Sequence, residues 1–219
     1  MLRVFLLSDL HGRIPKIPAF DRANYDAVVL AGDITNGTIV KNHLDVMFQK
    51  LDFLGEFYFI PGNSDLPELA EMKLSNPNAI CLHQRVQTWG DYEFFGTGGA
   101  TFGLINNFAM SDEDYEATLR SAYALRHLDS EHQILVAHDP PRDTCLDRNI
   151  PGNHVGSQAT RKVVEEFQPL LMLCGHIHES RGVEKIGSTT CVNGGAAKIG
   201  SGADVTIDGT EVTVTFIDF

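Results

Sequence analysis

Short apolar runs of strand length recur along this chain, and they constrain its fold more than any other feature. Several of them are bounded by glycine or proline, and runs of this length and composition are typical of buried β-strands. We therefore expect a central β-sheet built from six runs: Arg3–Leu7, Ala27–Ala31, Phe57–Ile60, Glu93–Gly96, Ile134–Ala137 and Leu170–Cys174.

Helical patterns lie between these runs. Apolar residues recur at helical spacing at Val40, Leu44, Met47 and Leu51. Ser111 precedes an acidic turn and an amphipathic stretch, which predicts a capped helix. A third helix is expected to follow Ser157 and to end before Pro169. Strands that alternate with helices indicate an α/β fold.

The C-terminal part is richer in strands than the rest. Three β-rich segments, Thr189–Asn193, Ala203–Ile207 and Val212–Ile217, predict an antiparallel meander with a hairpin turn at Asp208-Gly209. Two packed sheets with helices outside are therefore expected. No repeat or linker divides the chain, so residues 1–219 are interpreted as one domain.

Composition restricts the class of partner. Among 219 residues, 17 Lys and Arg oppose 29 Asp and Glu, which gives a net charge of −12. Such an acidic chain is not expected to bind a nucleic-acid polymer, because that binding relies on basic residues that neutralise phosphates. No apolar run approaches the roughly 20 residues of a membrane span. The four cysteines form no CxxC pair and are interpreted as structural thiols of a cytoplasmic protein.

Polar side chains follow the expected strands where each strand ends. The carboxyl ends of strands in open α/β sheets meet at one edge, so these side chains are expected to converge there. In extended backbone, residues two apart project to the same side, which pairs Asp9 with His11 and His176 with His178. The full set is Asp9, His11, Asp33, Asn63, His138, His176 and His178.

This set of donors indicates a dinuclear metal centre. Carboxylates, imidazoles and a carboxamide are mixed oxygen and nitrogen ligands, and there are more of them than one divalent ion needs. Two divalent ions (Mn, Fe, Zn or Ni) can activate a bridging water and stabilise a phosphoryl group during in-line displacement. Asp33 suits a bridging position because a carboxylate has two oxygens. The metal charge attracts an anion locally, so a small phosphate ester is the expected substrate.

The same residues carry a resemblance to a known family. The ordered motifs Asp9-Leu-His11, Gly32-Asp33, Gly62-Asn63, His138 and Gly175-His-Ile-His178 resemble the calcineurin-like metallophosphoesterase superfamily, in its small single-domain bacterial and archaeal branch. The resemblance implies a four-layer αββα sandwich with two mixed β-sheets. It implies one metal held by Asp9, His11, Asp33 and His178. It implies a second metal held by Asp33, Asn63, His138 and His176.

One position departs from the family pattern. The family usually has histidine after Gly-Asn, where it stabilises the phosphate or protonates the leaving group, but this chain has Ser64. A serine hydroxyl donates a hydrogen bond but is not a proton donor near neutral pH. His154, in a Gly/Asn-rich loop, is the candidate replacement acid. Arg142 and Arg148 in the same loop are candidate phosphate ligands, with a solvated surface charge as the alternative for either. Asp65 is expected to cap a turn or to orient a neighbouring side chain.

The sequence thus favours a dinuclear metal-dependent phosphodiesterase. A metal-bridging hydroxide would attack phosphorus in line, with Asn63 and the metals holding the phosphoryl oxygens. Three alternatives stay open: a phosphomonoesterase, a non-catalytic metal-binding scaffold on the same fold, and a dinuclear hydrolase of amides. Retention of all seven ligand positions favours an enzyme over a scaffold. The oligomeric state is left open.

Overall fold

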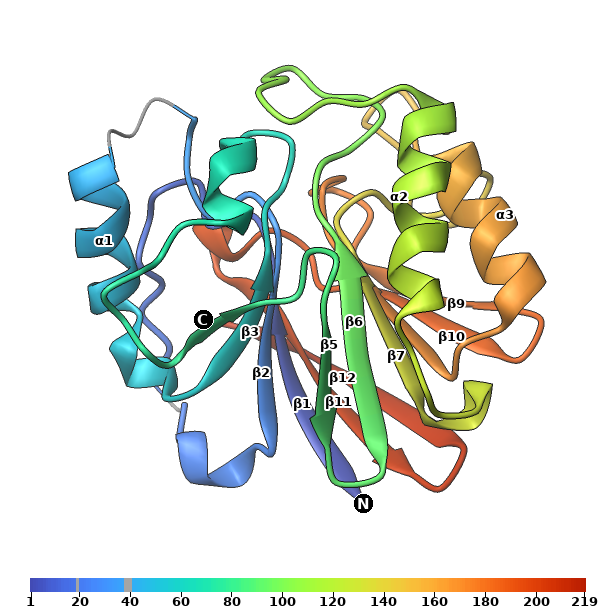
Figure 1. Cartoon of the computed structure of the whole chain (residues 1–219), viewed down its shortest axis with the longest axis horizontal. Helices are drawn as coiled ribbons and strands as arrows, with labels where there is room; N and C mark the ends of the chain where they lie inside the picture. Colours follow the sequence, from blue (N-terminus) through green and yellow to red (C-terminus); the bar gives the residue numbers. More distant parts are fainter. Residues whose placement is uncertain (19, 38–40) are drawn as a thin grey trace.

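Two mixed β-sheets of six strands each pack face to face, with helices on both outer faces (Figure 1). The computed structural model describes residues 1–18, 20–37 and 41–219. Val40, the first residue of the expected helical pattern, lies outside the described residues. The expected four-layer αββα sandwich with two mixed sheets is confirmed.

The first sheet has the strand order β12-β11-β1-β2-β3-β4. Strands β1 to β4 pair in parallel, while β11 pairs antiparallel with both β1 and β12. The bounds of these strands are β1 Leu2–Leu7, β2 Ala27–Ala31, β3 Phe57–Ile60, β4 Ala79–Cys81, β11 Ser201–Asp208 and β12 Glu211–Asp218.

The second sheet has the order β5-β6-β7-β8-β10-β9. Its central strands β6, β7, β8 and β10 are parallel, and the edge strands β5 and β9 are antiparallel to their neighbours. The bounds are β5 Val86–Trp89, β6 Tyr92–Thr97, β7 Gln133–Ala137, β8 Leu171–Cys174, β9 Gly182–Ile186 and β10 Thr189–Asn193.

The expected C-terminal meander is wrong in its pairing. Strand β10 lies in the second sheet beside β8 and β9, whereas β11 and β12 form a hairpin in the first sheet. The chain therefore crosses from one sheet to the other after Asn193. The hairpin turn is also displaced by one residue, because Asp208 pairs with Glu211 and leaves Gly209 and Thr210 in the turn.

Within the described part of the chain, three α-helices cover the outer faces. Helix α1 (Lys41–Lys50) lies on the first sheet, and α2 (Asp112–Ala124) and α3 (Gln158–Phe167) lie on the second (Figure 1). Ser111 and Ser157 cap α2 and α3 as expected, since each side chain accepts a hydrogen bond from the backbone three residues on. Short 3₁₀ helices span Arg22–Asn24, Asp52–Leu54, Pro67–Ala70, Ser130–His132 and Ala197–Ile199. Within the described residues, no helix has both the length and the apolar character that crossing a bilayer requires.

The sheet-to-sheet interface is a continuous apolar core. It includes Leu6 and Val29 from the first sheet and Val136 and Leu173 from the second, all fully buried. This core holds the two sheets so that the carboxyl ends of their parallel strands lie at the same edge, the upper edge in Figure 1. The loops that follow β1, β2, β3, β7 and β8 leave from this edge.

Truncation of the core is expected to destabilise the whole fold. Leu173→Ala removes a fully buried side chain between the sheets, and we expect a loss of about 2–5 kcal/mol in the free energy of unfolding. Urea denaturation measures this as a lower midpoint with an unchanged slope. Leu125→Ala, at a residue that is 42% exposed, is the matched control and should stay within about 0.5 kcal/mol. Equal effects of the two substitutions would contradict the assigned core.

Candidate metal centre

The candidate ligands leave the strands in left-handed backbone conformations. Asp9, His11, Asp33 and His176 have φ angles of 57°, 46°, 50° and 69°. A non-glycine residue in this region is strained by about 1–3 kcal/mol and persists where the surrounding structure holds it. From the sequence, extended backbone was expected to place these side chains on the same side. That reason is wrong, because tight left-handed turns bring the side chains together instead.

Glycines allow the turns to approach one another closely. A Cβ atom on Gly32, whose φ is +93°, would lie 2.4 Å from Nδ1 of His138. A Cβ atom on Gly175 would lie 1.6 Å from the hydroxyl of Ser8. Any side chain at either glycine would push apart the loops that carry the candidate ligands.

Asp9, His11 and His178 form the first group of candidate ligands. Nε2 of His178 lies 3.0 Å from Oδ1 of Asp9 and 3.2 Å from Nε2 of His11. Nε2 of His11 lies 3.7 Å from the same Asp9 oxygen. Atoms that bind one ion at about 2.0–2.2 Å lie roughly 3.0–3.5 Å apart, so this triangle fits a divalent metal.

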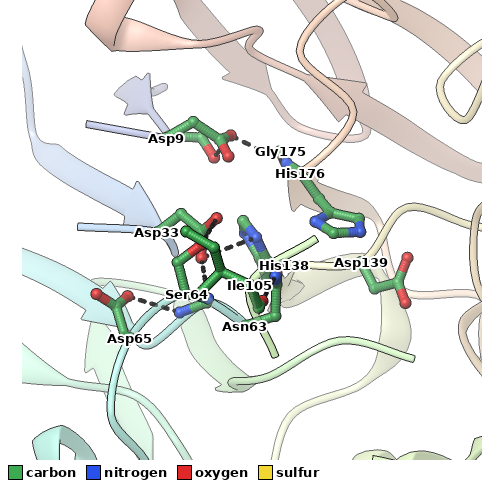
Figure 2. Close-up of polar contacts among 12 residues, drawn as sticks. Asp9, Asp33, Asn63, Ser64, Asp65, Ile105, His138, Asp139, Gly175 and His176 are labelled. Atoms are coloured by element: carbon green, nitrogen blue, oxygen red, sulfur yellow. Dashed lines mark hydrogen bonds and ion pairs between the residues drawn. The ribbon is translucent and has the colours of Figure 1, made fainter. Parts of the chain in front are cut away.

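Asp33, His138 and His176 form the second group, and Asn63 lies beside it in Figure 2. Among the residues that the structure describes, three buried atoms here have no hydrogen-bond partner: Oδ1 of Asn63, Nε2 of His138 and Nε2 of His176. Buried polar atoms are almost always paired, because an unpaired one costs about 1–3 kcal/mol. A divalent ion would satisfy all three through their lone pairs, so these residues fit the second metal.

Asp33 lies between the two groups. Its Oδ2 is 3.6 Å from Nε2 of His11, and its Oδ1 is 3.4 Å from Nε2 of His138. One carboxylate thus turns one oxygen towards each group. The division of the seven residues into two metal-binding sets that share Asp33 stays a prediction.

Hydrogen bonds from outside the two groups orient the candidate ligands. Nδ1 of His138 lies 2.7 Å from the carbonyl oxygen of Ala31, which favours the tautomer with the proton on Nδ1 and a lone pair on Nε2. The backbone N–H of His176 donates to Oδ2 of Asp9 at 2.9 Å, and the Ser8 hydroxyl donates to the same oxygen. This leaves Oδ1 of Asp9 for the first group.

Ser64 positions Asp33. Its backbone N–H donates to one Asp33 oxygen and its hydroxyl to the other, both at 2.8 Å (Figure 2). Ser64 is buried, with 2% of its surface exposed. The sequence identified this residue as a departure from the family pattern but gave no signal for the contact with Asp33.

Asp65 joins the loops that carry Asp33 and Asn63. Its carboxylate accepts hydrogen bonds from the backbone N–H groups of Ile34, Thr35 and Gly62, at 3.0, 2.7 and 2.8 Å. Burial and the nearby Asp33 charge raise the pKa of Asp65 to about 6. The hydroxyl of Thr35 also donates to Asp65, at 2.7 Å, so the expectation that Asp65 orients a neighbouring side chain is confirmed.

Burial and charge act in opposite directions on the imidazoles of the second group. Burial tends to lower the pKa of His138, but the Asp33 and Asp9 carboxylates raise it to about 10. Burial, together with the neighbouring His138, lowers the pKa of His176 to about 4. The two carboxylates therefore attract positive charge to this point, as a cation site requires.

A cavity of about 670 Å³ opens above the two groups. Its lining includes five candidate ligands: His11, Asp33, Asn63, His176 and His178. Two cations also line it, Lys198 and Arg13, and sequence reasoning missed both. Lys198 lies in a Gly/Ala-rich turn after β10, and its spacing from the metal motifs carries no signal.

The structure does not bring His154 into this cavity. His154 lines a neighbouring pocket together with Arg142, and that pocket shares the side chains of Phe102 and Val155 with the metal cavity. Nδ1 of His154 lies 2.6 Å from Oδ1 of Asp147. The catalytic role of His154 stays a prediction.

Comparison with known proteins identifies the family. The model of the calcineurin-like phosphoesterase family matches residues 2–180. The chain belongs to this family. It is 30% identical over 201 residues to the uncharacterized protein MJ1162 of Methanocaldococcus jannaschii, covering 88% of this chain and 87% of that protein.

Solved structures share the fold of this calcineurin-like phosphoesterase. TT1561 of Thermus thermophilus superposes with a TM-score of 0.73 at 19% identity, covering 98% of each chain. A dimetal phosphatase from Danio rerio superposes with a TM-score of 0.61 at 13% identity, covering 100% of this chain and 99% of that one. The family and the two groups of ligand atoms together support a metal-dependent phosphoester hydrolase that takes two divalent ions.

Removal of Asp33 is expected to weaken metal binding at both groups. Asp33→Ala takes away the shared carboxylate. Loss of a group that only hydrogen-bonds to a metal ligand lowers metal affinity by roughly 10–100-fold, and we expect a larger loss here. His176→Ala is the matched control, because it should weaken the second group alone. Elemental analysis after equilibrium dialysis against Mn²⁺ measures the bound metal. Wild-type stoichiometry in Asp33→Ala would remove the shared ligand from the account.

Loss of the Ser64 hydroxyl is expected to have a smaller effect. Ser64→Ala removes one of two hydrogen bonds to Asp33, and we expect Mn²⁺ to bind about tenfold more weakly. Calorimetric titration measures the affinity, and Ser121→Ala, at an exposed serine on α2, is the control. If Ser64→Ala bound Mn²⁺ like the wild type, the hydroxyl would have no positioning role.

Proposed function

We propose that this calcineurin-like phosphoesterase is a dinuclear phosphodiesterase. The observation that carries the dinuclear part is the shared Asp33, with its two oxygens 3.6 and 3.4 Å from imidazoles of different groups. Such a pair of groups at the floor of a cavity suits phosphoryl transfer, in which metal charge stabilises the phosphate and activates water.

The residues of the chain have distinct tasks in this reaction. Two bound divalent ions would supply the electrophilic charge and lower the pKa of an attacking water. Asn63, His138 and His176 would hold one ion, and Asp9, His11 and His178 would hold the other. Ser64 and Asp65 hold the loops that present these residues. Lys198 and Arg13 line the same cavity and add positive charge for the phosphate.

The preference for diesters rests on Ser64. Its hydroxyl is engaged with Asp33 and buried, so it does not take the place of the family histidine at the substrate. The histidines that line the cavity, among the described residues, are His11, His176 and His178, and all belong to the candidate ligand groups. A monoester dianion therefore lacks the additional donor that it meets in the family pattern. A cavity of about 670 Å³ also accommodates substituents on both sides of a phosphate.

The diester preference has a direct kinetic test. Aryl phosphodiesters and phosphomonoesters that share 4-nitrophenol as leaving group are compared by kcat/KM in the same Mn²⁺ buffer. We expect the diester to be preferred, since the buried Ser64 does not supply the additional donor that a monoester meets in the family pattern. A tenfold preference for the monoester, about 1.4 kcal/mol in the transition state, would identify a phosphomonoesterase instead.

His154 is proposed as the acid that protonates the leaving group. Asp147 holds Nδ1 of its ring, which leaves Nε2 to exchange a proton, and its pocket adjoins the metal cavity through Phe102 and Val155. Protonation requires the ester oxygen of the leaving group, or one water bound to it, to contact Nε2 past these two side chains. The Asp147 carboxylate also accepts hydrogen bonds from the backbone N–H groups of Thr144 and Gly156, which fixes the loop.

The role of His154 is tested by changing the leaving group. General acids contribute about 10²–10⁴-fold when the leaving group is an alkoxide and little when it is nitrophenolate. We therefore expect His154→Ala to slow a nucleoside phosphodiester strongly and a nitrophenyl diester hardly at all. His127→Ala, at an exposed histidine after α2, is the control. Equal loss on both substrates would assign His154 to the structure of the loop.

A further inference from the structure

Exposed apolar side chains surround the mouth of the metal cavity. Phe102, Leu104 and Ile199 line it and are 52%, 100% and 71% exposed. Ile150, next to the lining residue Asn149, is 88% exposed. We call Phe102, Leu104, Ile105, Ile150 and Ile199 the apolar rim. A group of exposed apolar residues around a polar cavity is a feature of binding sites.

The first segment of the rim is fixed to the second ligand group. Residues 102–105 lie in the loop between β6 and α2, at the top of Figure 1. The side-chain amide of Asn63 donates to the carbonyl oxygen of Ile105 (Figure 2). The backbone N–H of Phe108 donates to the carbonyl oxygen of Asn63 at 3.1 Å. The loop thus keeps its apolar side chains over the cavity while its backbone contacts a candidate ligand.

The other two segments are fixed to the first ligand group. The backbone N–H of Lys198, beside Ile199, donates to the carbonyl oxygen of Asp9 at 3.1 Å. The backbone N–H of Ile150 donates to Glu179, the residue after His178, at 2.8 Å. Each rim segment is therefore hydrogen-bonded to a residue in or next to a ligand group, and the apolar side chains stand at fixed positions around the metals.

Charge and polarity divide the cavity into two zones. The floor carries the metal groups, and the cations Lys198 and Arg13 line the same cavity, so an anionic phosphate fits there. The rim carries apolar side chains that gain free energy when they leave water. A ligand with a phosphate at one end and an extended apolar group at the other matches both zones at once.

We infer that the substrate is a phosphate ester with an extended apolar substituent, which lies across the apolar rim. The inference rests on the proposed phosphodiester hydrolysis and specifies its substrate class. A second protein copy fits less well, because a protein surface on the rim would leave the two candidate metal groups beneath it without a partner. The rim acts by binding the substituent and takes no part in the chemical step.

A homologous series of substrates tests the inference. Methyl, propyl and hexyl 4-nitrophenyl phosphodiesters share one leaving group and differ in the apolar substituent alone. We expect kcat/KM of the Mn²⁺-loaded protein to rise with chain length, by about tenfold or more from methyl to hexyl. Leu104→Ser and Ile199→Ser should each lower the hexyl-to-methyl ratio by about threefold to tenfold. Leu125→Ser, at the exposed residue that follows α2, should leave the ratio unchanged.

Binding without turnover gives a second readout. Calorimetry compares the affinities of methylphosphonate and hexylphosphonate for the Mn²⁺-loaded protein. We expect hexylphosphonate to bind more tightly, and we expect Leu104→Ser to reduce the ratio of the two affinities. Hydrolysis of all three diesters at one rate, with equal affinity for both phosphonates, would overturn the apolar substrate class and leave the phosphodiesterase standing. Failure to hydrolyse any diester would overturn the proposed function itself. A rim variant that changes the oligomeric state and leaves the chain-length ratio unchanged would assign the rim to a contact between copies.

Discussion

The carboxylate of Asp33 is the interaction on which the rest of the site depends. It sits in a left-handed turn after β2 and turns one oxygen towards each ligand group. Two divalent ions held by the two groups would repel each other, and a carboxylate between them offsets this repulsion. Both groups require this carboxylate at one position. The loops that carry the candidate ligands, after β1, β2, β3, β7 and β8, must therefore keep fixed positions relative to one another.

Hydrogen bonds behind the candidate ligands fix the positions of these loops. Asp65 binds the backbone of the loops after β2 and β3, and Ser64 fixes both oxygens of Asp33. The apolar core between the sheets holds the strand ends in place, and its stability offsets the strain of the left-handed turns. Ser64 thus has a structural use in this chain, because its hydroxyl reaches Asp33.

The sequence predicted most strands well because their apolar pattern is local. The run Ala27–Ala31 is typical of a buried strand, and Asp33 follows after one glycine. The pairing of β10 with β8 was missed, because strand order depends on contacts far apart in sequence. Strand β9 was missed because Gly182–Ile186 alternates exposed and buried residues at a sheet edge. Lys198 was missed because its approach to the cavity follows from the crossover between the sheets.

Anomalous diffraction from crystals of the wild-type chain soaked in Mn²⁺ tests the central claim most directly. The account predicts two manganese peaks about 3.5–4 Å apart. One should lie among Asp9, His11 and His178, the other among Asn63, His138 and His176, with Asp33 between them. A single peak, or two peaks with Asp33 bound to only one of them, would contradict the shared carboxylate.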